Sequence, residues 1–152
     1  MVKRFLASDI VVKDIDAAAK RYSEIPGVKP NWKSHPAYPD MRECAFYPGN
    51  SKFVLLTSKG NDHVGRLLRE RGEGVVTIYF EVDDIDEEVK RLRKLGVEFT
   101  TEEAMTFEEG KVIFATASSL NVGGIPVGFT EARSDLPWGK SIIPTEGFPG
   151  KR

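Results

Sequence analysis

The chain has 152 residues, of which 40% are hydrophobic and 30% charged, a composition typical of one globular domain with a sizeable core. The formal net charge of −1 gives no reason to expect nucleic acid or an anionic membrane as a partner. No apolar run is long enough to span a bilayer, and the N-terminus lacks the apolar segment of a signal peptide. Because Cys44 is the single cysteine, no internal disulfide is possible, and we expect a cytoplasmic protein.

The first half of the chain is predicted to contain a strand, a helix and further strands. The segment KRFLASDIVV, residues 3–12, has the β-branched and apolar residues of a strand. Asp14 follows it in the position of a helix N-cap, and the pair Pro26-Gly27 ends the helix. Two strands are then predicted, MRECAFYP and SKFVLLTS, with the turn PGN between them. The intervening KPNWKSHPAYPDM, rich in proline and aromatic residues, is predicted to be either a lid over a cavity or a plain connection.

A short amphipathic helix is predicted to link the two halves over residues 62–72. Asp62 stands in the N-cap position, Val64, Leu67 and Leu68 form an apolar face, and Gly72 ends the helix.

The second half is predicted to repeat the same order of elements. A strand, GVVTIYFEV, precedes Asp84, again in N-cap position. Three residues later, Glu87 completes a pattern that resembles a capping box. The acidic segment TTEEAMTFEEGKV is predicted to be a solvated loop, and KVIFATAS and IPVGFTE are predicted strands. The helical spacing of four apolar residues predicts the buried face of the helix: Ile85, Val89, Leu92 and Leu95.

The C-terminal tail, residues 132–152, contains three prolines and is predicted to be irregular. It also carries apolar residues, which we expect to pack on this domain or on a second subunit: Trp138, Ile142, Ile143 and Phe148.

The chain contains an internal repeat with an offset of 70 residues. The segment VVKDIDAAAKRY, from Val11, aligns with EVDDIDEEVKRL, from Glu81, so that Asp14 matches Asp84. A match over a whole strand-turn-helix unit indicates two similar modules. We therefore predict an α+β fold in a single domain, 1–152, built from two tandem β-α-β-β-β modules, 4–58 and 74–131.

These modules resemble the vicinal oxygen chelate superfamily, which includes glyoxalase I, bleomycin-resistance proteins, extradiol dioxygenases and methylmalonyl-CoA epimerase. The segments DIVVKDIDAAAKRY and LLRERGEGVVTIYFEVDDIDEEVKRLRKLGVEF are most similar to the epimerase. The resemblance covers roughly residues 4–131 and implies two modules that form a half-open, barrel-like cavity. It also implies a homodimer.

In metal-bearing members of the superfamily, four side chains, two from each module, hold a divalent metal. By resemblance, these ligand positions fall on Ala7, Val54, Thr77 and Gly128. Alanine, valine and glycine side chains have no donor atom, and a threonine hydroxyl is a poor ligand for a divalent metal. We therefore expect no metal cofactor, and a cavity that is larger and more apolar than in the metal-bearing members.

Two carboxylates are candidates for acid–base chemistry in such a cavity, since period-2 alternation directs both toward it. Asp9, facing a largely apolar space, would have a raised pKa and could transfer protons; a surface aspartate at a strand edge is the alternative. Glu43 aligns with a glutamate that some epimerases place near the substrate, and the alternative is a solvated charge. Tyr79 could donate a hydrogen bond to a ligand or fill the space left by the metal. The expected ligand-binding residues are Ala7, Val54, Thr77, Tyr79, Gly128, Tyr47 and Trp32.

Three functions are compatible with these features. The first is a protein of the bleomycin-resistance type, whose metal-free cavity binds a small organic molecule. The second is a metal-independent isomerase or lyase in which Asp9 or Glu43 moves a proton. The third is a CoA-ester enzyme similar to methylmalonyl-CoA epimerase, although no basic cluster suited to the CoA phosphates stands out. The sequence leaves open whether the protein is an enzyme.

Overall fold

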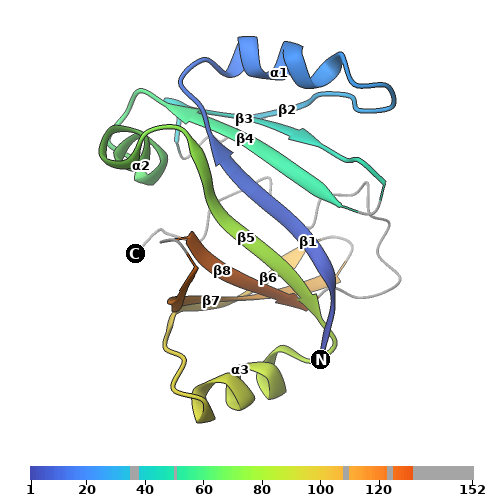
Figure 1. The fold of residues 1–152 in the computed structure, drawn as a ribbon, viewed down its shortest axis with the longest axis vertical. Helices are drawn as coiled ribbons and strands as arrows, with labels where there is room; N and C mark the ends of the chain where they lie inside the picture. Colours follow the sequence, from blue (N-terminus) through green and yellow to red (C-terminus); the bar gives the residue numbers. More distant parts are fainter. Residues whose placement is uncertain (35–37, 50, 108–109, 123–124, 132–152) are drawn as a thin grey trace. The chain divides into compact units, whose positions relative to one another are not determined.

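The computed structural model describes residues 1–131 except 35–37, 50, 108–109 and 123–124 (Figure 1). The predicted irregular tail, residues 132–152, lies outside the described residues. The fold is of the α+β class, with a mixed sheet of parallel and antiparallel pairs, as predicted. Within the described part of the chain, none of the helices has the length and apolar character needed to cross a bilayer.

The chain divides into two compact units, which are described separately. The N-terminal unit contains Ala7–Val76, and the C-terminal unit contains Met1–Leu6 together with the described residues from Thr77 onward. The first strand, β1 (Val2–Val11), and the fifth, β5 (Gly74–Val82), each contribute residues to both units.

In the N-terminal unit the strands lie in the order β2-β3-β4-β1. The last two, β4 and β1, run parallel, whereas the β2–β3 and β3–β4 pairs are antiparallel. The remaining elements of this unit are α1 (Ile15–Ser23), β2 (Asn31–Ser34), β3 (Met41–Phe46), β4 (Lys52–Ser58) and α2 (His63–Arg71).

In the C-terminal unit the strands lie in the order β5-β8-β7-β6. Here β5 and β8 are parallel, and the β8–β7 and β7–β6 pairs are antiparallel. Each unit therefore has the same strand order and the same directions. The remaining elements of this unit are α3 (Ile85–Lys94), β6 (Phe99–Phe107), β7 (Gly110–Val122) and β8 (Ile125–Glu131).

Each of the three helices in the described part of the chain starts at the aspartate predicted to cap it. The Asp14 carboxylate accepts a hydrogen bond from the backbone N–H of Ala17 at 2.9 Å. Asp84 and Asp62 make the equivalent bonds, also at 2.9 Å, to the third residue after each of them. Such a bond satisfies one of the backbone donors that a helix leaves open at its start. The three N-cap predictions are thus confirmed.

Both strands that the sequence reading missed are edge strands. The proline-rich segment predicted as a lid or connection contains β2, and the acidic segment predicted as a solvated loop contains most of β6. An edge strand has a neighbour on one side only and commonly carries charged or polar residues, so its sequence resembles a loop. The predicted apolar face of α3 is also wrong at Leu95, which is 69% exposed, whereas its other three residues are buried.

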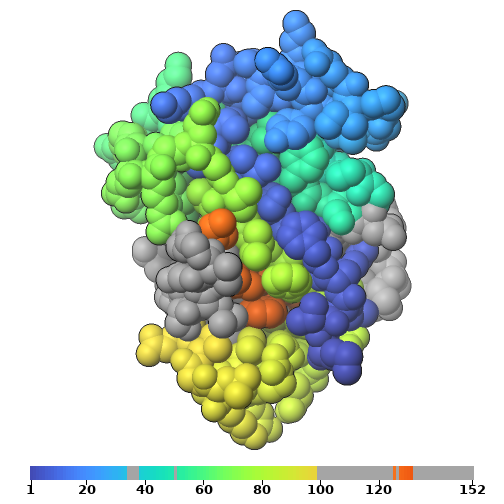
Figure 2. All heavy atoms as spheres, viewed as in Figure 1, coloured from blue at the N-terminus to red at the C-terminus, as the bar shows by residue number. Residues whose placement is uncertain are grey.

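The core of the N-terminal unit lies on one face of its sheet, under α1 (Figure 1). Ile15 and Ala19 of this helix belong to one buried cluster with Phe46 and Leu55 of the strands. The rings of Phe46 and Phe53 are stacked with centroids 4.9 Å apart. In the space-filling view, α1 and the segment after it, in blue, form an outer layer of this unit (Figure 2). The helix α1 thus covers this face of the sheet.

Candidate functional site

The opposite face of this sheet carries four charged residues, which we call the charged face: Asp9, Lys33, Glu43 and Lys52. The strand register places them together. Lys52 pairs with Ala7, and Asp9 pairs with Val54 two residues further along both strands. Lys33 pairs with Glu43 across β2 and β3. Since alternate residues of a strand share a face, these residues lie opposite the Phe46 and Leu55 side chains under α1. Apolar residues surround them on this face: Ala7, Val11, Ala45, Val54 and Leu56.

Three of the four charged side chains are almost fully buried. Asp9 is 2% exposed, Glu43 0% and Lys52 3%. Burial, together with the nearby charge of Lys33, lowers the pKa of the Lys52 amine to about 7, while Asp9 and Glu43 oppose the change. Burial also lowers the pKa of Lys33, with the Glu43 charge opposing it. The charged face is therefore an array of interacting ionisable groups.

The sequence reading found the carboxylates of this array and missed its amines. It expected Asp9 to face a largely apolar space, whereas two lysines interact with the carboxylates. A signal for Lys52 was present, because it alternates with Val54 and Leu56, both assigned to this face. The neighbouring sequence gives no indication that Lys52 is buried, because a lysine at the first residue of a strand is usually solvated.

The four positions that correspond, by resemblance, to the superfamily's metal ligands do not offer a suitable donor set. Ala7 and Val54 lie on the charged face, buried and without donor atoms. In the C-terminal unit, Thr77 is half-buried and Gly128 has no side chain. Among the residues that the structure describes, no group of three or more His, Cys, Asp or Glu is placed to hold a metal ion. The residues present therefore do not fit a divalent metal bound in the manner of the superfamily.

Tyr79 covers the backbone of Gly128 within the C-terminal unit. The two residues are direct partners in the β5–β8 pair. A Cβ atom built on Gly128 would lie 2.3 Å from Cδ1 and 2.5 Å from Cε1 of the Tyr79 ring. Tyr79 thus occupies the space that a ligand side chain at position 128 would need. This geometry supports the space-filling alternative for Tyr79 and leaves a role in ligand binding untested.

Glu81, on the same face of β5 as Thr77 and Tyr79, is bound by cations of its own unit. Its carboxylate accepts a hydrogen bond from Arg4 Nε at 2.6 Å, and Lys3 Nζ lies 3.6 Å away. The carboxylate is buried, and this pairing offsets part of its desolvation cost. Glu81 is therefore committed to an ion pair.

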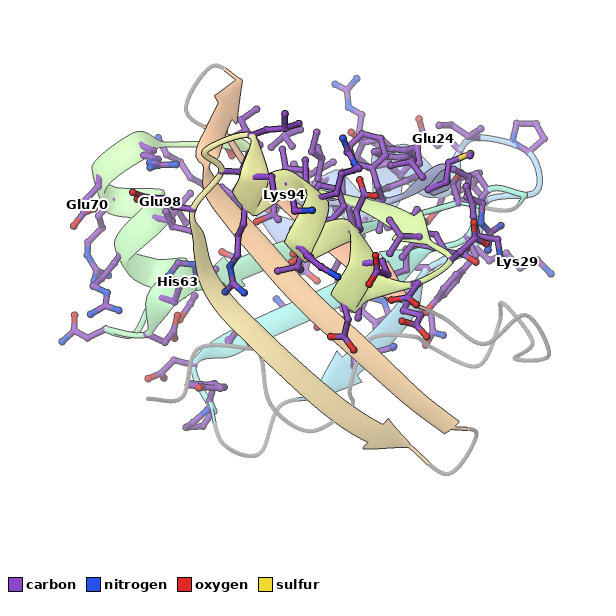
Figure 3. All side chains as sticks on the ribbon, turned by 90° about the horizontal axis from the view of Figure 1, so that it is seen from below. Glu24, Lys29, His63, Glu70, Lys94 and Glu98 are labelled. Atoms are coloured by element: carbon purple, nitrogen blue, oxygen red, sulfur yellow. The ribbon has the colours of Figure 1, made fainter. Side chains whose placement is uncertain are left out.

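Trp32 and Cys44 lie away from the charged face. Trp32 pairs with Cys44 and so points to the other side of the sheet, where it is 45% exposed and stacks with the Arg42 guanidinium. Cys44 is buried in the core under α1, and burial raises the pKa of its thiol. His63 projects from α2 (Figure 3), and burial lowers its pKa. Tyr47 directly follows β3 and is half-buried.

Comparison with known proteins gives a family match and structural neighbours. The family model described as Glyoxalase/Bleomycin resistance protein/Dioxygenase superfamily matches residues 9–114. No curated protein sequence matches the chain significantly.

Among solved structures, the chain is similar to a variant of Streptomyces coelicolor methylmalonyl-CoA epimerase in complex with 2-nitronate-propionyl-CoA, with a TM-score of 0.70 and 21% identity, over 88% of this chain and 100% of that one. It is also similar to methylmalonyl-CoA epimerase from Mycobacterium tuberculosis, with a TM-score of 0.69 and 20% identity, over 87% and 89% of the two chains. A hypothetical protein from Bacillus halodurans C-125 has a TM-score of 0.72 and 20% identity, over 88% and 97%. Likenesses at such identities establish the fold.

Proposed function

Because the chain belongs to the glyoxalase/bleomycin resistance protein/dioxygenase superfamily, we propose that it binds a small organic molecule at the charged face of its N-terminal unit, without a divalent metal held in the superfamily's manner. One observation carries this proposal. Buried, mutually interacting charges stand beside the two ligand positions of this unit, where the side chains, Ala7 and Val54, have no donor atoms. Buried ionisable groups of this kind are costly, and they cluster at functional sites.

The proposed ligand combines an apolar part with at least one polar group. Ala45, Val54 and Leu56 offer apolar contact, while the carboxylates and amines of the face offer hydrogen bonds and charge. The structural neighbours include a methylmalonyl-CoA epimerase in complex with methylmalonyl-CoA, which makes acyl-CoA esters one class to test. A homodimer and a cytoplasmic location remain predictions from the sequence.

A fragment screen followed by two-dimensional amide NMR tests the proposal. The screen should contain small carboxylic acids, amides and ketones, together with methylmalonyl-CoA, and should be run with and without EDTA. We expect ligands that shift the amide signals of Ala7, Asp9 and Val54 equally under both conditions. The variant Asp9→Asn should weaken this binding, whereas Asp86→Asn, an exposed carboxylate on α3, should not. Binding confined to other surfaces, or binding that EDTA abolishes, would contradict the proposal.

Proton transfer by an isomerase or lyase is the second candidate function. It is favoured by the burial of both Asp9 and Glu43 beside a lysine amine, an arrangement that suits general acid–base catalysis. In this case a bound ligand with an acidic C–H bond would exchange that hydrogen for deuterium in D₂O. Loss of the exchange in Glu43→Gln, with ligand binding retained, would distinguish catalysis from binding alone.

A further inference from the structure

Lys52 is a buried charged residue for which the described part of the chain provides no hydrogen-bond acceptor. Its side chain is almost fully buried, and its Nζ atom has no hydrogen-bond partner in the part of the chain that the structure describes. A lysine ammonium has three N–H donors, and burying them unsatisfied is strongly unfavourable. The amine is therefore positioned to donate to an acceptor that is not part of the described protein.

The position of Lys52 in the sheet ties this amine to the proposed site. Lys52 pairs directly with Ala7 and lies two residues before Val54 on the same face of β4. Ala7 and Val54 are the two positions of this unit that correspond, by resemblance, to metal ligands. A positive charge is thus provided beside positions whose own side chains can provide neither charge nor a donor atom.

The neighbouring charges attract this amine overall and leave the charged face without net charge. Asp9 and Glu43 attract the ammonium electrostatically, and Lys33 repels it. With both lysines protonated and both carboxylates ionised, the four charges sum to zero. A monoanionic ligand therefore meets no net negative charge, and the carboxylates favour the protonated amine on which binding depends.

We propose, building on the function proposed above, that Lys52 Nζ donates hydrogen bonds to an anionic oxygen of the bound organic molecule, so that the ligand is a small carboxylate or an enolate-type oxyanion. The lysine then supplies the positive charge that a metal would supply in other members of the superfamily. If the face also transfers protons, a carboxylate of the face takes the proton from the ligand carbon, and the resulting oxyanion accepts from Lys52.

Propanoate and its neutral isostere propanamide are suitable probes. They have nearly the same shape, and they differ in the charge that the amine is proposed to recognise. We expect propanoate to bind more tightly than propanamide, in NMR titrations that follow the amides of the charged face. Because the protonated amine is required, propanoate binding should weaken about tenfold between pH 6 and pH 8. Asp9, Glu43 and Lys33 are the other titratable groups whose charges act on this amine.

Three variants test whether the preference for propanoate and its pH dependence arise from Lys52. Lys52→Met should lose at least about tenfold in propanoate affinity, as expected for a charge-assisted hydrogen bond, and should bind propanamide as the wild type does. Lys52→Arg should retain propanoate binding and lose its pH dependence, because arginine stays protonated. Lys29→Met removes an exposed lysine of the same unit, whose side chain projects away from the protein (Figure 3), and should change nothing.

Other outcomes overturn the inference. Equal affinities for propanoate and propanamide in the wild type would show that charge is not recognised. Unchanged propanoate binding in Lys52→Met would show that this amine is not the donor, while leaving ligand binding at the face intact. The Lys52 side-chain NMR signals of the wild type provide a test that needs no variant, since propanoate must raise the pKa of this amine. Failure of the fragment screen to shift the face at all would instead contradict the proposed function.

Discussion

As the pH is lowered from 10 to 7, the free energy of unfolding of the wild-type protein, relative to that of Lys52→Met, should fall by about 1.4 kcal/mol for each pH unit. The amine has a pKa of about 7 in the folded state, against an ordinary value of 10.5. Between these values the unfolded chain binds a proton that the folded protein does not bind. Stability therefore rises with pH across this window and decreases as pH falls, by about 5 kcal/mol in total. Below pH 7 both states are protonated, and the effect levels off.

Urea unfolding curves from pH 6.5 to pH 10 measure this difference directly. The comparison with Lys52→Met cancels the titration of groups that the two proteins share. Lys29→Met, an exposed lysine in the same unit, is the matched control and should remain parallel to the wild type at every pH. Parallel curves for the wild type and Lys52→Met would show that Lys52 titrates as a solvated lysine does, and that the charged face is not built as described.

Gly128→Ala should destabilise the protein by about 1–3 kcal/mol, the usual cost of overpacking a well-filled site. The added methyl group would lie 2.3 Å from the Tyr79 ring, which is closer than real Cβ contacts allow, so the ring or the strand must shift. A glutamate, whose carboxylate could coordinate a metal, needs still more of that space. The geometry thus predicts that a metal ligand cannot be restored at this position by one substitution.

A double-mutant cycle isolates this contact. The cost of Gly128→Ala, measured by urea unfolding, should be largely relieved in a Tyr79→Ala background, where the ring is absent. It should persist in a Tyr79→Phe background, because phenylalanine keeps the ring and removes the hydroxyl alone. If Gly128→Ala costs the same in all three backgrounds, the Tyr79 ring is not what restricts position 128.

Local sequence patterns predicted those parts of the fold that local interactions determine. The aspartates at 14, 62 and 84 start helices because each accepts from a backbone N–H three residues later, a bond that needs only nearby residues. The strands β2 and β6 were missed because an edge strand needs no continuous apolar or alternating pattern. Leu95 fits the helical spacing of the apolar face, yet it is the C-cap residue that follows the last helical residue, and it is exposed.

The residues of the candidate site likewise divide into those that local sequence patterns predict and those whose burial depends on distant residues. Alternation along β1 and β3 placed Asp9 and Glu43 on a common face, and both are buried there. The burial of Lys52, by contrast, depends on packing by residues distant in the sequence, and no local pattern reports it. The absence of donor atoms at Ala7 and Val54 is a property of residue type and could be read at once. The role proposed for Lys52, a positive charge in place of a metal, could be inferred only from the strand register that brings Lys52 beside Ala7.

The central claim is that the charged face binds an organic ligand without a divalent metal held at the superfamily's positions. Metal analysis by mass spectrometry, combined with ligand affinity measured on the same purified sample before and after EDTA treatment, tests it most directly. The account predicts less than one equivalent of zinc, nickel, cobalt, iron or manganese, and an affinity that EDTA leaves unchanged. One equivalent of such a metal, whose removal abolishes ligand binding, would contradict it.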